Sequence, residues 1–202
     1  MKKLKYIFPI AVLGLSALFT ACSPEDNQEL PKYNPKIYFV DFKGASTAEF
    51  DKTPFTNFAE AGTKIWEGKK DSRSENEYYE FSPFKSNESV NIAWFVTPAI
   101  NIDLANAKRL TFQTAQHHVV NSTNNDLKLY VSNNFNGNVL EATWVEFQFK
   151  KPAANSKHYD WINSGGINLT QFSGNIHIAF KGTGGTASSD AGSYMIDNIK
   201  VF

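Results

Sequence analysis

The chain has 202 residues, of which 20 are basic, 20 are acidic and 42% are hydrophobic. This balance offers no basic surface of the kind that nucleic-acid binding requires, so we expect no nucleic-acid partner. The single cysteine excludes a disulfide framework, while seventeen phenylalanines, eight tyrosines and four tryptophans favour strands over helices.

The N-terminus is typical of a secretory signal peptide. Lys2, Lys3 and Lys5 precede an uncharged run over residues 6–21, which is too short for a comfortable membrane span. The run ends in "LFTAC", and small residues before Cys22 are the pattern that a lipoprotein signal peptidase cleaves. We expect Cys22 to become a lipidated N-terminus that anchors the protein without spanning the membrane. The alternative is an ordinary signal peptide, residues 1–21, followed by an incidental cysteine.

Residues 22–35 are predicted to be a flexible tether. The stretch "SPEDNQELPKYNP" is polar and contains three prolines. A serine and nearby acids after the cysteine resemble the signal that exports lipoproteins to the exterior of some Gram-negative bacteria, although Pro24 interrupts the match. We therefore expect a lipid-anchored protein of the outer membrane, on the cell surface or the periplasmic face. Without residues 1–21, 17 basic residues face 20 acidic ones.

Alternating apolar and polar residues predict about nine strands after the tether and no amphipathic helix. In "DLKLYVS" the apolar residues are Leu127, Leu129 and Val131, and "TWVEFQF" at 143–149 repeats this pattern, with Val145 among its inward residues. The other candidate strands are "KIYFVDF" from 36, "TKIWEG" from 63, "EYYEFS" from 77, "IAWFVT" from 92, "RLTFQTA" from 109, "NIHIAFK" from 175 and "YMIDNIKVF" from 194.

These strands predict an all-β fold over residues 36–202, a two-sheet β-sandwich of the jelly-roll type. Pro98 in "WFVTPAINI" lacks an amide proton, so the chain should leave the ladder there and resume as a short strand in a different position. An edge strand that ends in a loop is the alternative. In a regular last strand Ile196 and Ile199 would point to opposite faces, although both are apolar. This break in the alternation predicts a β-bulge at Asp197 or the next residue.

Seven motifs follow one another along the chain: "VDFKG" (40–44), "WFVTPAINI" (94–102), "RLTFQTA" (109–115), "LKLYVSNNFNGN" (127–138), "ATWVEF" (142–147), "INLTQFSGNIHIAFK" (167–181) and "YMIDNIKV" (194–201). Their order resembles that of extracellular jelly-roll domains of the choice-of-anchor-J type and related lipoprotein domains. The resemblance implies a galactose-binding-like β-sandwich that accompanies surface adhesins, secreted hydrolases and glycan-uptake lipoproteins, without catalytic activity of its own.

The resemblance also implies that the first and last strands are neighbours, which would bring Asp41 close to Asp197. Calcium prefers carboxylate and carbonyl oxygens, so this pair is a candidate structural calcium site. Lys43 stands where relatives often carry an acid, and its charge argues against an ion. The alternative is that both aspartates are exposed or cap turns.

Catalytic motifs are absent from the sequence, which has no nucleophile elbow, HExxH, CxxC or phosphate loop. We therefore expect a protein that is not an enzyme. His117 and His118 are adjacent, so on a strand they should point to opposite faces and form a solvated strand end, without sharing a metal.

Sugar binding requires aromatic faces beside amide and carboxylate groups. The best local set is Trp161 with Tyr159, Asp160 and Asn163, and Trp144 is expected off the main core face. For each aromatic residue, packing in the core is the alternative. The expected function is that of a non-enzymatic, surface-anchored binding lipoprotein whose partner is a glycan. The alternative is an adhesin or envelope assembly module that binds a protein.

Overall fold

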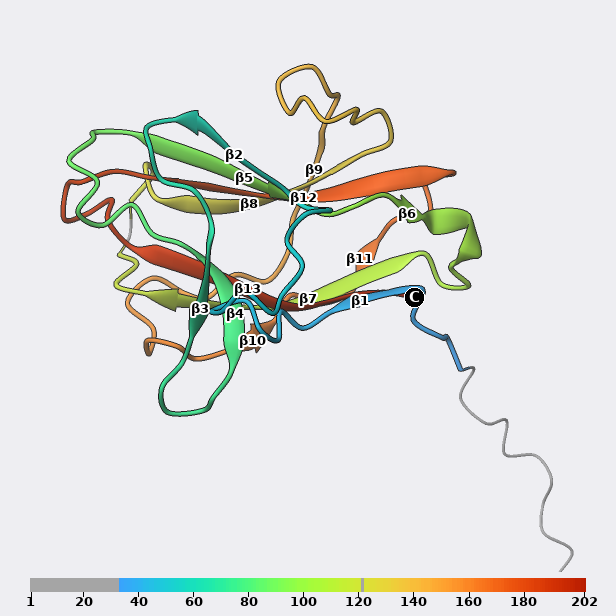
Figure 1. The fold of residues 1–202 in the computed structure, drawn as a ribbon, viewed down its shortest axis with the longest axis horizontal. Coiled ribbons are helices and arrows are strands. Elements are labelled where there is room, and N and C mark those ends of the chain that lie inside the picture. The colour runs from blue at the N-terminus through green and yellow to red at the C-terminus, as the bar shows by residue number, and fades with distance from the viewer. Residues whose placement is uncertain (1–32, 121) are drawn as a thin grey trace, which may run out of the picture. The chain divides into compact units, whose positions relative to one another are not determined.

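The computed structural model describes residues 33–120 and 122–202, and their strands form a jelly-roll β-sandwich of two antiparallel sheets (Figure 1). Sheet one has the order β10-β7-β13-β4-β3, with β1 beside β13 and β11 beside β7. Its strands are β1 (Tyr38–Val40), β3 (Glu67–Lys70), β4 (Glu77–Phe81), β7 (Arg109–His117), β10 (Ile162–Asn163), β11 (Ile167–Asn168) and β13 (Ser193–Val201).

Sheet two has the order β2-β5-β12-β8-β9, with β6 also paired to β12. A short 3₁₀ helix, η1 (Ile102–Leu104), follows β6. Figure 1 shows the two sheets as separate layers. The strands of sheet two are β2 (Thr56–Ala61), β5 (Asn91–Val96), β6 (Ile100–Asn101), β8 (Asp126–Ser132), β9 (Val145–Phe147) and β12 (Asn175–Gly184).

The core lies between the sheets because each strand turns alternate apolar residues inward. Phe112 of β7 and Phe180 of β12 meet edge to face, with ring centroids 4.9 Å apart. The predicted inward residues of 126–132 are fully buried. Val145 was expected inside but is 39% exposed, because β9 is the last strand of its sheet.

Several boundaries differ from the prediction. The strand expected over 63–68 begins only at Glu67, as β3. Strand β2 was not predicted, because its segment "TNFAEA" has no regular alternation of apolar and polar residues. Pro98 does interrupt the ladder. Because β5 and β6 both pair with β12, the chain resumes its pairing after Pro98 with an earlier part of the same strand. In the parts of the chain that the structure describes, no helix is long and apolar enough to cross a membrane.

The predicted bulge in the last strand is confirmed. The pairing of β13 with β7 shifts between Asp197 and Lys200, and Asn198 has a φ of 53°. The predicted neighbourhood of the first and last strands is also confirmed, since Val40 of β1 pairs with Ile199 of β13.

Candidate functional site

The outer face of sheet one is hollowed over its central strands. In the register, Ser193 of β13 faces His117 of β7, and Met195 faces Glu80 of β4. These side chains point away from the core between the sheets because they alternate along their strands with residues of that core, such as Tyr79, Phe81 and Tyr194. The hollow holds about 550 Å³ and is called here the outer groove; it is lined by Glu80, Ser82, Phe84, His117, His118, Val120, Tyr159, Ser188, Ala191 and Ser193.

Two exposed aromatic rings stand in the outer groove. Phe84, in the loop after β4, is 57% exposed, and Tyr159, in the loop before β10, is 37% exposed. The Tyr159 ring leans on the His117 ring, with centroids 4.8 Å apart and planes inclined by 32°. An aromatic ring with one side against the protein and one side open can carry the apolar face of a ligand.

Polar groups flank these rings. Burial raises the pKa of Glu80, an effect that the charge of Lys69 opposes. The Ser193 hydroxyl donates to the Ser82 hydroxyl at 2.8 Å. Tyr159 also borders a smaller hollow that contains Asp71 and Arg73, so its ring lies between two polar regions of the same side of the molecule.

Gln116, the residue before His117, fixes the loop that carries Tyr159. Its side-chain amide donates to the carbonyl of Ser156 at 2.6 Å, and its amide oxygen accepts from the N–H of Val119 at 2.8 Å. Its own backbone carbonyl accepts from the N–H of Tyr159 at 3.0 Å. Because Gln116 is fully buried, these bonds join the end of β7 to the loop before β10 away from competing water.

The predicted aromatic set lies partly at this groove. Trp161 packs on the outer face of sheet one against Met195 and Tyr78, and its ring meets the Tyr78 ring edge to face at 5.4 Å. Trp161 is therefore half-buried packing beside the groove, whereas Tyr159 lines it. Asp160 and Asn163 are exposed on the same segment and do not line the groove.

Trp144 lies on the other side of the sandwich, on the outer face of sheet two. Its ring centroid is 5.4 Å from that of Trp94 and 5.6 Å from that of Phe135. Its indole N–H donates to the carbonyl of Val139 at 2.9 Å. Trp144 is off the main core, as predicted, but the structure does not bring it together with Trp161.

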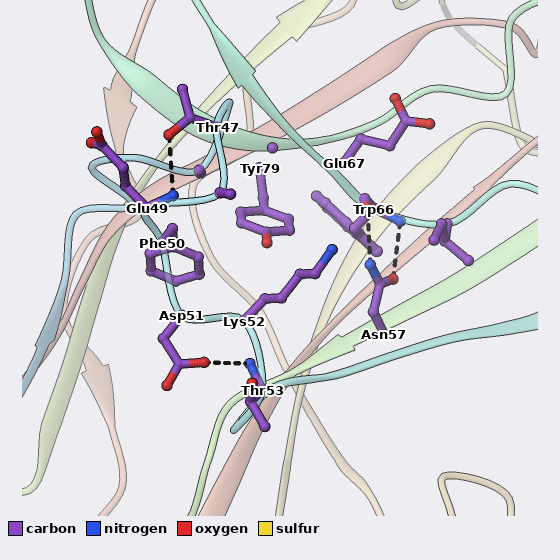
Figure 2. Close-up of a pocket in the computed structure, with 14 residues that line it drawn as sticks. Thr47, Glu49, Phe50, Asp51, Lys52, Thr53, Asn57, Trp66, Glu67 and Tyr79 are labelled. Carbon is purple, nitrogen blue, oxygen red and sulfur yellow. Dashed lines mark hydrogen bonds between the residues drawn. The ribbon is translucent and has the colours of Figure 1, made fainter.

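A second cleft of about 570 Å³ lies under the loop between β1 and β2 (Figure 2). Trp66 and Tyr79 line it, but they are only 1% and 4% exposed and present little open ring surface. The side-chain amide of Asn57 donates to the carbonyl of Trp66 at 2.6 Å, and its amide oxygen accepts from the N–H of Trp66 at 3.0 Å. The Lys52 side chain extends across the cleft in Figure 2. Phe50 also lines the cleft and is partly buried, so the aromatic rings of this cleft are less exposed than Phe84 and Tyr159 of the outer groove.

Sequence reasoning missed Phe84 and Glu80 as groove residues. A signal for Phe84 was present, because an aromatic residue in the polar turn "SPFKSN" has few core partners. Glu80 gave no such signal, since strand alternation shows that it points outward but not that a hollow lies over it.

His117 and His118 do form a partly solvated strand end, but the expectation that their side chains point to opposite faces was wrong. The two rings lie together, with centroids 4.1 Å apart. The reason is the backbone of His118, whose φ of 58° is left-handed and ends the strand alternation at that residue. Both imidazoles therefore border the outer groove.

Asp197, at the bulge, is buried and fully engaged with protein groups. Its carboxylate accepts from the side chain of Asn76 at 3.0 Å and from the backbone and side-chain N–H groups of Asn198 at 2.6 and 3.0 Å. Burial raises its pKa to about 6, and the charge of Asp41 adds to this rise. Asp41 itself is exposed and accepts from the N–H of Lys43 at 3.2 Å. The two aspartates do lie near each other, and calcium binding there stays a prediction.

The fold has solved counterparts among adhesin domains. No family model and no curated protein matches the sequence. The chain is similar in fold to gingipain adhesin domains. The K1 cleaved adhesin domain of Lys-gingipain from Porphyromonas gingivalis W83 has a TM-score of 0.54 and 16% identity, covering 82% of this chain and 96% of that one. The K3 domain has a TM-score of 0.53 and 14% identity, covering 83% and 99%.

A carbohydrate-binding module in complex with β-1,4-galactotriose matches more loosely, with a TM-score of 0.47 and 14% identity over 81% of this chain and 94% of that one. At these identities the similarities describe the β-sandwich and not its ligand.

Proposed function

We propose that residues 36–202 form a non-enzymatic carbohydrate-binding domain and that the outer groove is its binding site. The observation that carries this proposal is the exposed ring of Tyr159, which stands in a hollow beside Phe84, Glu80 and three serine side chains. A pyranose has an apolar C–H face and a rim of hydroxyls, so it needs this combination of ring and polar groups.

Binding without turnover fits the chemistry of the lining. Glycoside hydrolysis generally uses two carboxyl groups on either side of the scissile bond. Among the described residues that line the outer groove, only Glu80 carries a carboxyl group. We therefore propose that the groove holds a glycan and leaves it unchanged.

A polysaccharide panel tests the proposal. Residues 34–202, which form one compact unit, are run in native gels that contain one soluble polysaccharide each. The wild type should be retarded by at least one polysaccharide, and Tyr159→Ala should weaken the binding about tenfold, as expected for loss of a stacking ring. Phe39→Ala is the matched control, because Phe39 is a 44% exposed aromatic residue on β1 and does not line the groove. Equal mobility of all three proteins in every gel would refute the proposal.

The second candidate function is binding of a protein partner in the cell envelope. The outer face of sheet two favours it, because Leu140, in the loop before Trp144, is 65% exposed. Exposed apolar residues beside an aromatic cluster are typical of protein interfaces. Crosslinking in intact membranes separates the two functions: a partner lost on Leu140→Asp, but not on Tyr159→Ala, would support protein binding.

We also propose that the domain is held at the outer membrane by lipid on Cys22, through a tether over residues 22–35 after removal of residues 1–21. Cys22 lies outside the described residues, and this part of the proposal rests on the signal sequence alone. A tethered binding domain would keep captured glycan close to the membrane surface, on the exterior or the periplasmic face.

A further inference from the structure

Three of the four histidines of the chain form one cluster beside the outer groove. They are His117 at the end of β7, His118 directly after it, and His158 in the loop before β10. Their ligand nitrogens all lie within 4.8 Å of one another. The ring centroid of His158 lies 4.6 Å from that of His117 and 4.3 Å from that of His118.

We propose that His117, His118 and His158 bind a divalent transition-metal ion of the zinc class. Three imidazoles suit zinc, copper or nickel, and three protein ligands leave one position of a tetrahedral ion for an outside donor. His117 and His118 line the outer groove, so water or another oxygen ligand can approach the cluster from that hollow.

The geometry requires only a small adjustment. A tetrahedral zinc ion with Zn–N bonds of about 2.0–2.1 Å places its ligand nitrogens about 3.4 Å apart. The nitrogens here lie within 4.8 Å, a difference that side-chain rotations can close. His118 and His158 are exposed and have room to turn, whereas His117 is half-buried and fixes the position of the site.

The backbone that brings the three rings together is held by tertiary contacts. Asn155 donates its N–H to the carbonyl of Val119 at 2.8 Å, in addition to the bonds that Gln116 makes to the same loop. These bonds lie on both sides of the cluster and fix the loop of His158 against the turn of His118. A supported arrangement of ligands is what metal sites require.

The direction of the pKa shift of His117 is compatible with the metal site that the geometry supports. Burial lowers the pKa of His117, and the neighbouring His118 and His158 lower it further, because three imidazolium charges would repel one another. Neutral imidazole is the form that binds metals. The proposal is independent of carbohydrate binding, since it requires no glycan.

The test is zinc and cobalt titration of the full chain, purified in detergent with a tag that contains no histidine. Competition with a chromophoric chelator should show one zinc ion per chain, and Co²⁺ should give the absorption bands of a tetrahedral site. His158→Ala should weaken zinc binding at least ~100-fold. His118→Asn should do the same, and it keeps a residue type that tolerates the left-handed backbone.

The matched control is His177→Ala. His177 is the remaining histidine, lies on β12 of sheet two, and contacts the carbonyl of Thr97 at 2.9 Å. Its removal should leave zinc affinity and the cobalt spectrum unchanged. Circular dichroism confirms that each variant is folded. The proposal is overturned if the folded wild type binds no zinc at micromolar concentrations, or if folded His158→Ala and His118→Asn bind it as tightly as His177→Ala does.

Discussion

Asp197 is a buried carboxyl group whose ionisation works against folding. Its pKa is raised from 3.8 to about 6, mainly by burial. The folded state therefore binds its proton more tightly than the unfolded state. The resulting stabilisation is complete below pH 3.8 and is lost as the pH rises through 6. At neutral pH the ionised form costs about 3 kcal/mol relative to the protonated one.

This pKa predicts how Asp197→Asn depends on pH. The asparagine cannot ionise, so the free energy of unfolding of the variant, relative to wild type, should rise by about 2 kcal/mol between pH 4 and pH 7. Urea denaturation in EDTA across this range measures the difference, and the comparison cancels the titration of other carboxyl groups. A difference that stays constant over the range would show that the pKa of Asp197 is not raised.

Calcium is the other prediction for Asp41 and Asp197. An ion held by both carboxylates would stabilise the folded state by about RT ln(1 + [L]/Kd), or roughly 2.7 kcal/mol at a hundredfold excess over Kd. Thermal melts at neutral pH in millimolar calcium should then lie several degrees above melts in EDTA, and Asp197→Asn should remove most of the gain. Superimposable curves for the wild type would leave the two aspartates as bulge and turn residues.

At the scale of elements, the end of β7 and the loop before β10 are predicted to be one cooperative unit. Gln116→Leu leaves the buried N–H of Val119 without its acceptor, and an unsatisfied buried group costs about 1–3 kcal/mol. Urea denaturation should show this loss. Amide exchange at Tyr159, whose N–H bonds to residue 116, should become faster.

Gln148→Leu is the control for this change. Gln148 is exposed and makes only a 3.5 Å contact with Glu146, so its replacement should alter stability by less than about 0.5 kcal/mol. Unchanged exchange at Tyr159 in Gln116→Leu would show that the loop is held by other contacts.

The sequence predicted correctly those elements whose structure follows from the local alternation of apolar and polar residues. The alternation over 126–132 was sufficient for β8, and the phase break in 194–201 was sufficient for the bulge, because side chains in a strand alternate between its two faces. The position of His118 was beyond such reasoning. Its left-handed backbone accompanies bonds between Gln116 and Ser156, which are 40 residues apart in the sequence.

The same limit applies to the aromatic residues. The sequence suggested both Trp161 and Trp144 as sugar-binding aromatic residues, and both do lie off the main core. Which face each one occupies depends on the order of strands in the two sheets, which a local pattern does not contain. The groove itself is lined by residues of four separate chain segments, including those of Phe84 and Tyr159.

At the scale of the whole molecule, the proposed anchor makes a prediction that is independent of the groove. Cys22→Ser should release the protein from the membrane fraction or leave it as an unprocessed precursor, because acyl chains are its proposed membrane attachment. Cells grown with a radioactive fatty acid and then fractionated show the outcome. If wild-type protein takes up no label, the lipoprotein assignment is wrong.

The central claim is that the domain binds carbohydrate in the outer groove, and NMR mapping tests it most directly. Backbone amide and indole signals of ¹⁵N-labelled residues 34–202 are followed while an oligosaccharide, chosen from the polysaccharide that retards the protein, is added. The claim predicts that the largest shifts occur at His117, Tyr159 and Ser193, while the indole signals of Trp66 and Trp144 stay in place. Shifts centred on Trp144 or on the cleft of Figure 2, with the groove signals unmoved, would contradict it.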